Sequence, residues 1–104
     1  MAYQIKITEF AETDIDDAVA YILLDSSQNA LQWLSGIEEK ILTLQEMPKR
    51  CPLAPESEKI GRELRVLLYH KHRIIFDIDE EKEVVRILRV WHSARREVLP
   101  PDLL

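Results

Sequence analysis

The spacing of apolar residues changes twice along this chain, and the order of those spacings limits the folds open to it. Residues 3–8 alternate apolar and polar side chains, a pattern typical of a half-buried strand. From Ala11 the apolar residues recur every three or four positions to about Leu24, and again after Asp25-Ser26-Ser27 as far as Pro48. Two helices are therefore predicted, and the few residues between them indicate an antiparallel hairpin.

Three strand-like runs come after a proline-rich loop at residues 48–61. They cover residues 62–69, 72–78 and 84–92. The whole order predicts an α+β domain: an N-terminal strand, an antiparallel helix hairpin, and a three-stranded antiparallel meander with the helices packed on one face of the sheet. Residues 97–104 are expected to pack locally without forming an element.

The turn near His70 decides how the first two strands of the meander pair. A two-residue turn sets Arg65 opposite Phe76, whereas a three-residue turn sets Arg65 opposite Asp77. We favour the second register because it gathers apolar residues on one face; they are Leu64, Val66 and Leu68 opposite Ile78, Phe76 and Ile74. For the run 84–92, alternation leaves the core-facing side open because apolar residues occupy both sides.

Length and composition predict a single domain over residues 1–104. The chain has 104 residues, 46% of them apolar and 32% charged, which is typical of a foldable soluble domain. No apolar run approaches the roughly 20 residues of a membrane helix, and residues 1–5 do not resemble a signal segment. The lone Cys51 has no partner for an internal disulfide. We therefore expect a cytoplasmic protein without membrane contact.

Charge is unevenly distributed along the chain. Residues 1–47 carry nine acids and two bases (−7), residues 48–75 seven bases and three acids (+4), and residues 76–104 five bases and seven acids (−2), which sums to the net charge of −5. A basic middle suggests a face for anions. The acidic part is explained equally well by solvated helix surfaces, and we favour that interpretation.

Arginine and histidine are the side chains with the clearest chemical potential. Arginine binds phosphate oxygens through a fixed fork of donors, and histidine exchanges protons near neutral pH, so together they can bind RNA and promote attack of a 2′-hydroxyl without a metal. The alternative is an ordinary sheet face on which Arg65 pairs with Asp77 and Arg86 and Arg89 pair with nearby acids. His70 and His72 lack companions at the spacing of a zinc site and are expected to be surface turn residues. We predict no metal and no cofactor.

The ordered set of these segments resembles the RelE/ParE family of bacterial type II toxins, found in plasmid-stabilisation modules. The resemblance rests on residues 11–22, on Ala30 and residues 37–44 with Met47-Pro48, and on residues 61–65, 72–78 and 87–92 with Arg95-Arg96. It implies a growth-inhibiting toxin that a cognate antitoxin protein neutralises. It also implies one of two targets: ribosome-bound mRNA, cut by RelE-like members, or DNA gyrase, poisoned by ParE-like members.

The resemblance also assigns roles to residues. In the nuclease reading, Arg73 and His92 are catalytic and Arg65, Arg89, Arg95 and Arg96 bind RNA. Leu67 and Ile75 are expected to form an exposed apolar patch that binds the antitoxin.

Departures from the nuclease pattern leave the target open. No tyrosine follows Arg96, and Leu64 and Val66 stand where RelE-like members carry a lysine pair. Arg89-Val90-Trp91-His92 looks closer to the ParE side. The alternatives are a metal-free endoribonuclease, a non-enzymatic gyrase inhibitor, and an inactive relative that only binds an antitoxin; the sequence also leaves a homo-oligomer open.

Overall fold

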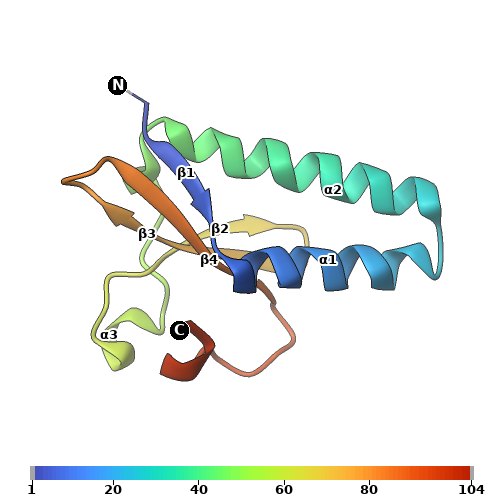
Figure 1. The fold of residues 1–104 in the computed structure, drawn as a ribbon. Helices are drawn as coiled ribbons and strands as arrows, with labels where there is room; N and C mark the ends of the chain where they lie inside the picture. The colour runs from blue at the N-terminus through green and yellow to red at the C-terminus, as the bar shows by residue number, and fades with distance from the viewer. Residues whose placement is uncertain (1, 104) are drawn as a thin grey trace.

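The computed structural model describes residues 2–103 as a four-stranded sheet with a helix hairpin on one face (Figure 1). The chain order is β1 (Gln4–Ile7), α1 (Glu9–Leu23), α2 (Ser27–Leu42), α3 (Ser57–Ile60), β2 (Arg65–Tyr69), β3 (His72–Asp79) and β4 (Val84–His92). Three short 3-10 turns are η1 (Thr43–Gln45), η2 (Pro48–Arg50) and η3 (Pro100–Leu103). The predicted α+β architecture is confirmed. Two local predictions are wrong: the loop after Pro48 contains α3, and the tail contains η3.

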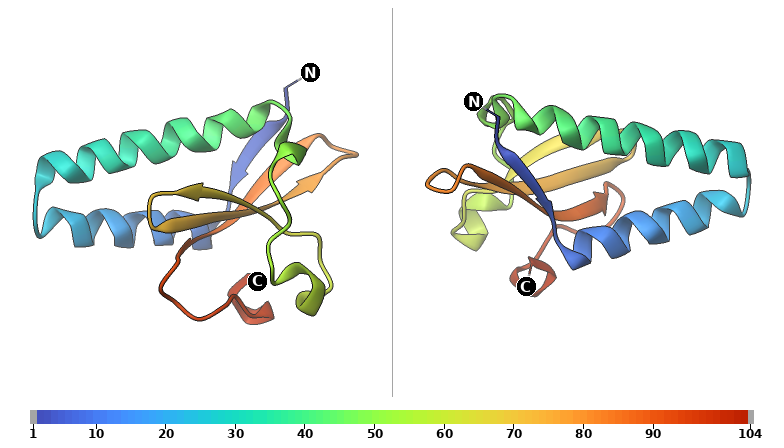
Figure 2. Two further views of the ribbon diagram at one scale, coloured as in Figure 1. Left: turned by 180° about the vertical axis from the view of Figure 1, so that it is seen from behind. Right: turned by 45° about the horizontal axis from the view of Figure 1, so that its top comes forward.

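The helices begin where side-chain oxygens cap their first turns. The Thr8 hydroxyl accepts a hydrogen bond from the Ala11 amide at 3.3 Å and donates one to the Ile87 carbonyl at 2.8 Å, which joins the start of α1 to β4. Ser26 caps α2 by accepting from the Asn29 amide at 3.1 Å, as the polar tripeptide between the helices predicts. The hairpin projects beyond one end of the sheet (Figure 2).

The strand order is β1-β4-β3-β2, with β1 parallel to β4 and the other pairs antiparallel. The favoured β2–β3 register is wrong: Arg65 lies opposite Phe76 and Tyr69 opposite His72, so the turn has the two residues His70 and Lys71. The reason is that both faces of this sheet are covered. With apolar layers on either side, nothing favours gathering all large side chains on one face.

A bulge in β4 explains why the alternation of apolar and polar residues in this strand did not show which side faces the core. Ile75 pairs with Arg89 and Phe76 with Ile87, so Leu88 is an extra residue on β4. The bulge shifts the alternation by one. Val85, Ile87 and Val90 therefore face the helices, whereas Leu88 and Trp91 face the second core.

The second core lies beneath the sheet, on the side away from the helix hairpin. It contains Val66, Ile75, Leu88, Trp91 and Val98, each no more than 9% exposed. Chain from both ends of the meander covers it: residues 54–60 on one side, and residues 96–103, which we call the C-terminal strap, on the other. The strap also contributes to the surroundings of Arg73, Arg89 and Arg96.

Candidate functional site

Arg73 is held in a nearly buried ion pair. Glu56, at the start of α3, is 3% exposed, and its two carboxylate oxygens accept hydrogen bonds from Arg73 Nη1 at 2.9 Å and Nη2 at 2.6 Å. The Val98 amide donates to the same carboxylate at 3.0 Å. The Arg73 hydrogen bonds, helped by the Val98 amide, outweigh the cost of burial and lower the pKa of Glu56 from 4.5 to about 2.

Arg89 joins three parts of the chain. Its Nε and Nη2 atoms each donate to the Asp14 carboxylate of α1 at 2.7 Å, and Nη1 donates to the Asp102 carbonyl oxygen at 2.9 Å. The Val90 amide also donates to Asp14, at 2.9 Å. Arg89 therefore ties α1 and the C-terminal strap to β4.

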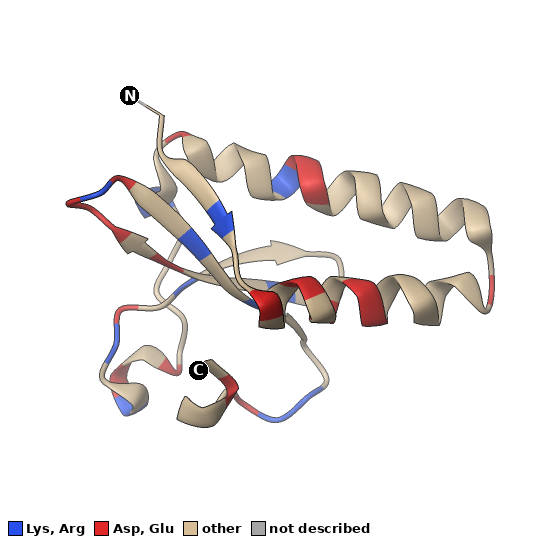
Figure 3. Cartoon of the chain, viewed as in Figure 1, with Lys and Arg blue, Asp and Glu red and all other residues tan. Residues whose placement is uncertain are grey.

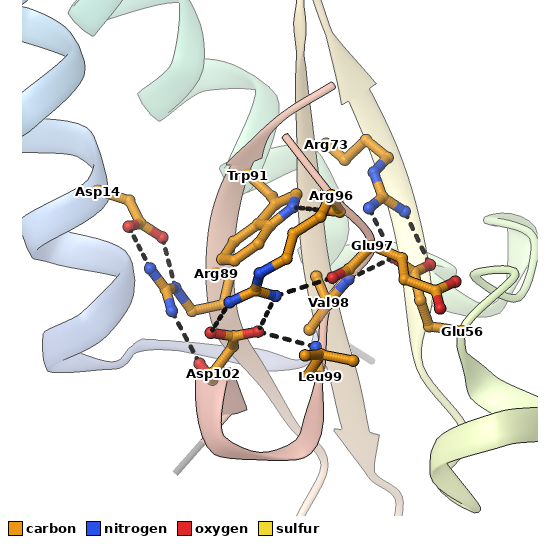
Figure 4. A network of polar contacts seen from close by, with 10 residues as sticks. All are labelled: Asp14, Glu56, Arg73, Arg89, Trp91, Arg96, Glu97, Val98, Leu99 and Asp102. Carbon is orange, nitrogen blue, oxygen red and sulfur yellow. Dashed lines mark hydrogen bonds and ion pairs between the residues drawn. The ribbon is translucent and has the colours of Figure 1, made fainter. Parts of the chain in front are cut away.

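Arg96 lies in the strap itself. Its guanidinium donates to both Asp102 oxygens, at 2.8 and 3.2 Å, and Asp102 also accepts from the Leu99 amide at 2.8 Å. The Trp91 ring nitrogen donates to the Arg96 carbonyl at 2.8 Å. Figure 4 shows how these contacts surround the strap. Arg73, predicted to be catalytic, and Arg89 and Arg96, predicted to bind RNA, thus have carboxylate partners that hold the fold together.

Arg65 has a structural partner as well, though not the predicted one. Its guanidinium donates to the Cys51 carbonyl at 2.7 Å and to Glu63 at 2.9 Å. Asp77 instead pairs with Arg62 and Arg86. The Arg65–Asp77 pair fails with the register, since it requires the three-residue turn.

His92 is separated from Arg73 by the sheet. In the β3–β4 register His72 pairs with His92, and Arg73 pairs with Trp91. Because neighbouring residues of a strand alternate between faces, the two histidines are on the helix side and Arg73 is on the strap side. The two predicted catalytic residues are not brought together.

His92 instead lines a hollow of about 600 Å³ beneath the overhanging end of α1. Its ring lies 5.0 Å from that of His72, and the His72 ring lies 5.3 Å from that of Trp33 on α2. Burial, with the neighbouring His92, lowers the pKa of His72 below its usual 6.5. Lys71 and Arg95 also line this hollow, and neither takes part in the ion pairs found among residues 2–103.

Sequence reasoning missed this hollow. His72 was expected to be a surface turn residue, but it is partly buried and contacts Trp33, 39 positions earlier in the chain. The cluster follows from the β3–β4 register, which sets His72 opposite His92 and which sequence reasoning did not derive. Across residues 2–103 no three His, Cys, Asp or Glu side chains are arranged to hold a metal ion.

Leu67 and Ile75 do not form the exposed patch that was expected. Ile75 is 1% exposed in the strap-side core, and Leu67 packs against the core on the helix side. They lie on opposite faces because Val66, not Leu67, pairs with Ile75.

The family model for the ParE toxin of the type II toxin-antitoxin system parDE matches residues 5–97, most of the chain. The chain belongs to the ParE toxin family. The recognised resemblance is thus confirmed at the level of family, and this ParE-family protein is the toxin component of a type II system.

Solved structures share its fold. A chain of the chromosomal ParDE system from P. aeruginosa is 23% identical with a TM-score of 0.69, over 88% of this chain and 96% of that one. A chain of the toxin-antitoxin complex RelBE2 from Mycobacterium tuberculosis is 24% identical with a TM-score of 0.63, over 88% of this chain and 99% of that one. No curated protein matches the sequence. Within residues 2–103 every helix is too short or too polar to cross a bilayer.

Proposed function

We propose that this ParE-family toxin inhibits growth by binding a protein target, DNA gyrase, rather than by cutting mRNA, and that a cognate antitoxin neutralises it. The observation that carries the proposal is the separation of Arg73 from His92 by the sheet. A phosphate-binding group and a proton-transferring group must both reach the same phosphate, within about 3 Å of the reacting atoms. Side chains on opposite faces of one sheet do not meet that requirement.

The state of Arg73 supports the same conclusion. A substrate phosphate would have to displace the Glu56 carboxylate, which holds both terminal guanidinium nitrogens and the strap amide of Val98. Removing one partner of such a buried pair typically costs 3–5 kcal/mol. Arg73 is therefore a structural cation rather than a free phosphate ligand. Because Arg73 and His92 cannot act together as a nuclease pair, gyrase is the target that remains of the two implied by the family resemblance.

For the antitoxin we propose a different surface from the predicted Leu67–Ile75 patch. A second hollow, of about 470 Å³, lies between α1, α2 and the exposed edge strand β1. Its apolar lining includes Ile5, Ile7 and Leu34, and its charged residues are all acids: Glu12, Asp16 and Glu38. Figure 3 shows the acids along α1. A basic, amphipathic antitoxin segment complements this groove in both charge and apolar surface.

The test of the mechanism uses purified protein in two assays. In a cell-free translation reaction we expect mRNA ends mapped by primer extension to be unchanged, and in a supercoiling assay we expect gyrase to be inhibited. Variants separate the readings: His92→Gln, and the neutral pair Glu56→Gln/Arg73→Met, should both remain toxic. Codon-registered mRNA cuts that disappear in His92→Gln would refute the proposal and establish the nuclease reading.

The antitoxin surface is tested by reversing its charge. Glu12→Lys with Glu38→Lys should weaken binding of the co-encoded antitoxin while leaving gyrase inhibition unchanged. Unaltered antitoxin binding by this variant would exclude the groove. A protein that neither inhibits gyrase nor affects translation, yet binds an antitoxin, would identify the inactive relative.

A further inference from the structure

Cations without carboxylate partners meet at one end of the sheet. Eight lysines and arginines among residues 2–103 are in ion pairs, but Lys71 in the β2–β3 turn and Arg95 just after β4 are not among them. The Ser93 amide donates to the Lys71 carbonyl at 2.8 Å, which brings the two segments together. Arg95 is also stacked on Trp91, 3.6 Å from the ring centroid. In a chain of net charge −5, this is a local basic site.

The hollow beside these cations has an apolar floor. Ala18, Ile22, Trp33 and Val90 line it, and Tyr21 stands at its rim, 78% exposed. Its volume of about 600 Å³ lies within the 300–1,000 Å³ typical of binding pockets. An exposed tyrosine beside a partly buried tryptophan is the kind of surface that aromatic side chains of a partner contact.

The two sides of the hollow differ in charge. Across from Lys71 and Arg95, α1 contributes two carboxylates, of which Asp14 is neutralised by Arg89 and Asp17 is exposed. The positively charged side of the hollow is therefore the sheet end. His92 adds a donor there: its Nδ1 accepts from the Ala94 amide at 3.0 Å, so the proton of the neutral ring is on Nε2.

We propose that this hollow binds an acidic segment of the toxin's protein target, with one aromatic side chain seated against Trp33 and flanking carboxylates paired with Lys71 and Arg95. The inference rests on the proposed function, because it takes the partner to be the target rather than the antitoxin. The two hollows have opposite charge, so they select different segments: the β1 groove a basic one, and the sheet-end hollow an acidic one.

The binding test uses synthetic peptides and needs no gyrase. The probe is acetyl-Glu-Asp-Phe-Asp-Glu-amide, with the same peptide carrying Ala in place of Phe, and a Lys-Lys-Phe-Lys-Lys version, as comparisons. Amide chemical shifts should move around Tyr21, Lys71 and Arg95 with the acidic aromatic peptide, less with the Ala peptide, and not with the basic one. Shifts confined to other surfaces, or equal for all peptides, would overturn the proposal.

Charge reversal provides the matched control. Lys71→Glu with Arg95→Glu should weaken the acidic peptide at least tenfold, whereas Lys82→Glu, an exposed lysine of the β3–β4 turn at the other end of the sheet, should leave it unchanged. Equal affinity of the double variant and the wild type would refute the site.

A gyrase assay separates this inference from the proposed function. Loss of gyrase inhibition in Lys71→Glu/Arg95→Glu, with antitoxin binding intact, supports both. Peptide binding at the hollow without any gyrase inhibition by the wild type supports the hollow and refutes gyrase as the target. Full gyrase inhibition by the double variant contradicts the hollow and leaves the proposed target standing.

Discussion

Replacing Glu56 by Gln should destabilise the fold by about 3 kcal/mol at pH 7. The carboxyl group is almost fully buried, and its pKa falls from 4.5 to about 2 because both terminal nitrogens of the Arg73 guanidinium donate hydrogen bonds to it. A fall of that size corresponds to about 3 kcal/mol in favour of the charged form. The independent expectation for breaking a buried ion pair, 3–5 kcal/mol, agrees. The amide of Gln keeps an acceptor for Val98, which favours the lower end of that range.

Urea denaturation followed by circular dichroism measures this difference. For a domain of this size the same loss lowers the midpoint of thermal unfolding by more than about 10 °C. The pH dependence has a definite sign: because the folded pKa is depressed, the stabilisation is complete above the unfolded value of 4.5 and is lost as pH falls toward 2. The wild type and Glu56→Gln should therefore converge in stability near pH 2.

The double variant Glu56→Gln/Arg73→Met is the control. If the cost comes from leaving Arg73 unpaired, removing its charge should recover more than about half of the loss. A loss below about 0.5 kcal/mol for Glu56→Gln, or no recovery in the double variant, would refute the reasoning. The result also bears on function, since lost toxicity in Arg73→Ala alone could come from unfolding rather than from a missing catalytic group.

Three further predictions concern the fold. Burial lowers the pKa of His72, so its protonation favours the unfolded chain; unfolding free energy should rise with pH up to about 6.5, and His72→Phe should flatten that rise in urea titrations. Thr8→Ala removes the cap of α1 and its bond to the Ile87 carbonyl, and should cost about 1–2 kcal/mol by the same assay. Circular dichroism and tryptophan fluorescence should give coincident transitions if residues 1–104 form one cooperative domain; separated midpoints would contradict that.

The two long helices and β1 could be predicted because each has a clear apolar period, but strand pairing could not. The β2–β3 register depended on whether one or both faces of the sheet were covered. The cover on the second face comes from residues 54–60 and from the C-terminal strap, whose only buried residue in 96–103 is Val98. The tail contains one valine and three leucines, but Pro100-Pro101 interrupts them and leaves no periodic signal, so the second core was not predicted and the wrong register was favoured.

The partners of the arginines could not be predicted from the sequence either. Seen in sequence, Arg73, Arg89 and Arg96 are equivalent basic residues. Their partners, Glu56, Asp14 and Asp102, lie 17, 75 and 6 positions away, and no local pattern indicates the first two. The bulge at Leu88 is a third case: it adds one residue without a glycine or proline to mark it.

The pairing of β1 with β4 has a consequence for synthesis. Ile5 pairs with Val85, so about 80 further residues must be synthesised after the first strand before its partner strand is available. At 5–20 residues per second, translation of that stretch takes roughly 4–16 s. During this interval the helix hairpin has emerged but the sheet against which it packs has not. The toxin therefore completes its fold late in translation, and both hollows form only after β4 has been made, because β4 lines the sheet-end hollow and holds the β1 wall of the acidic groove.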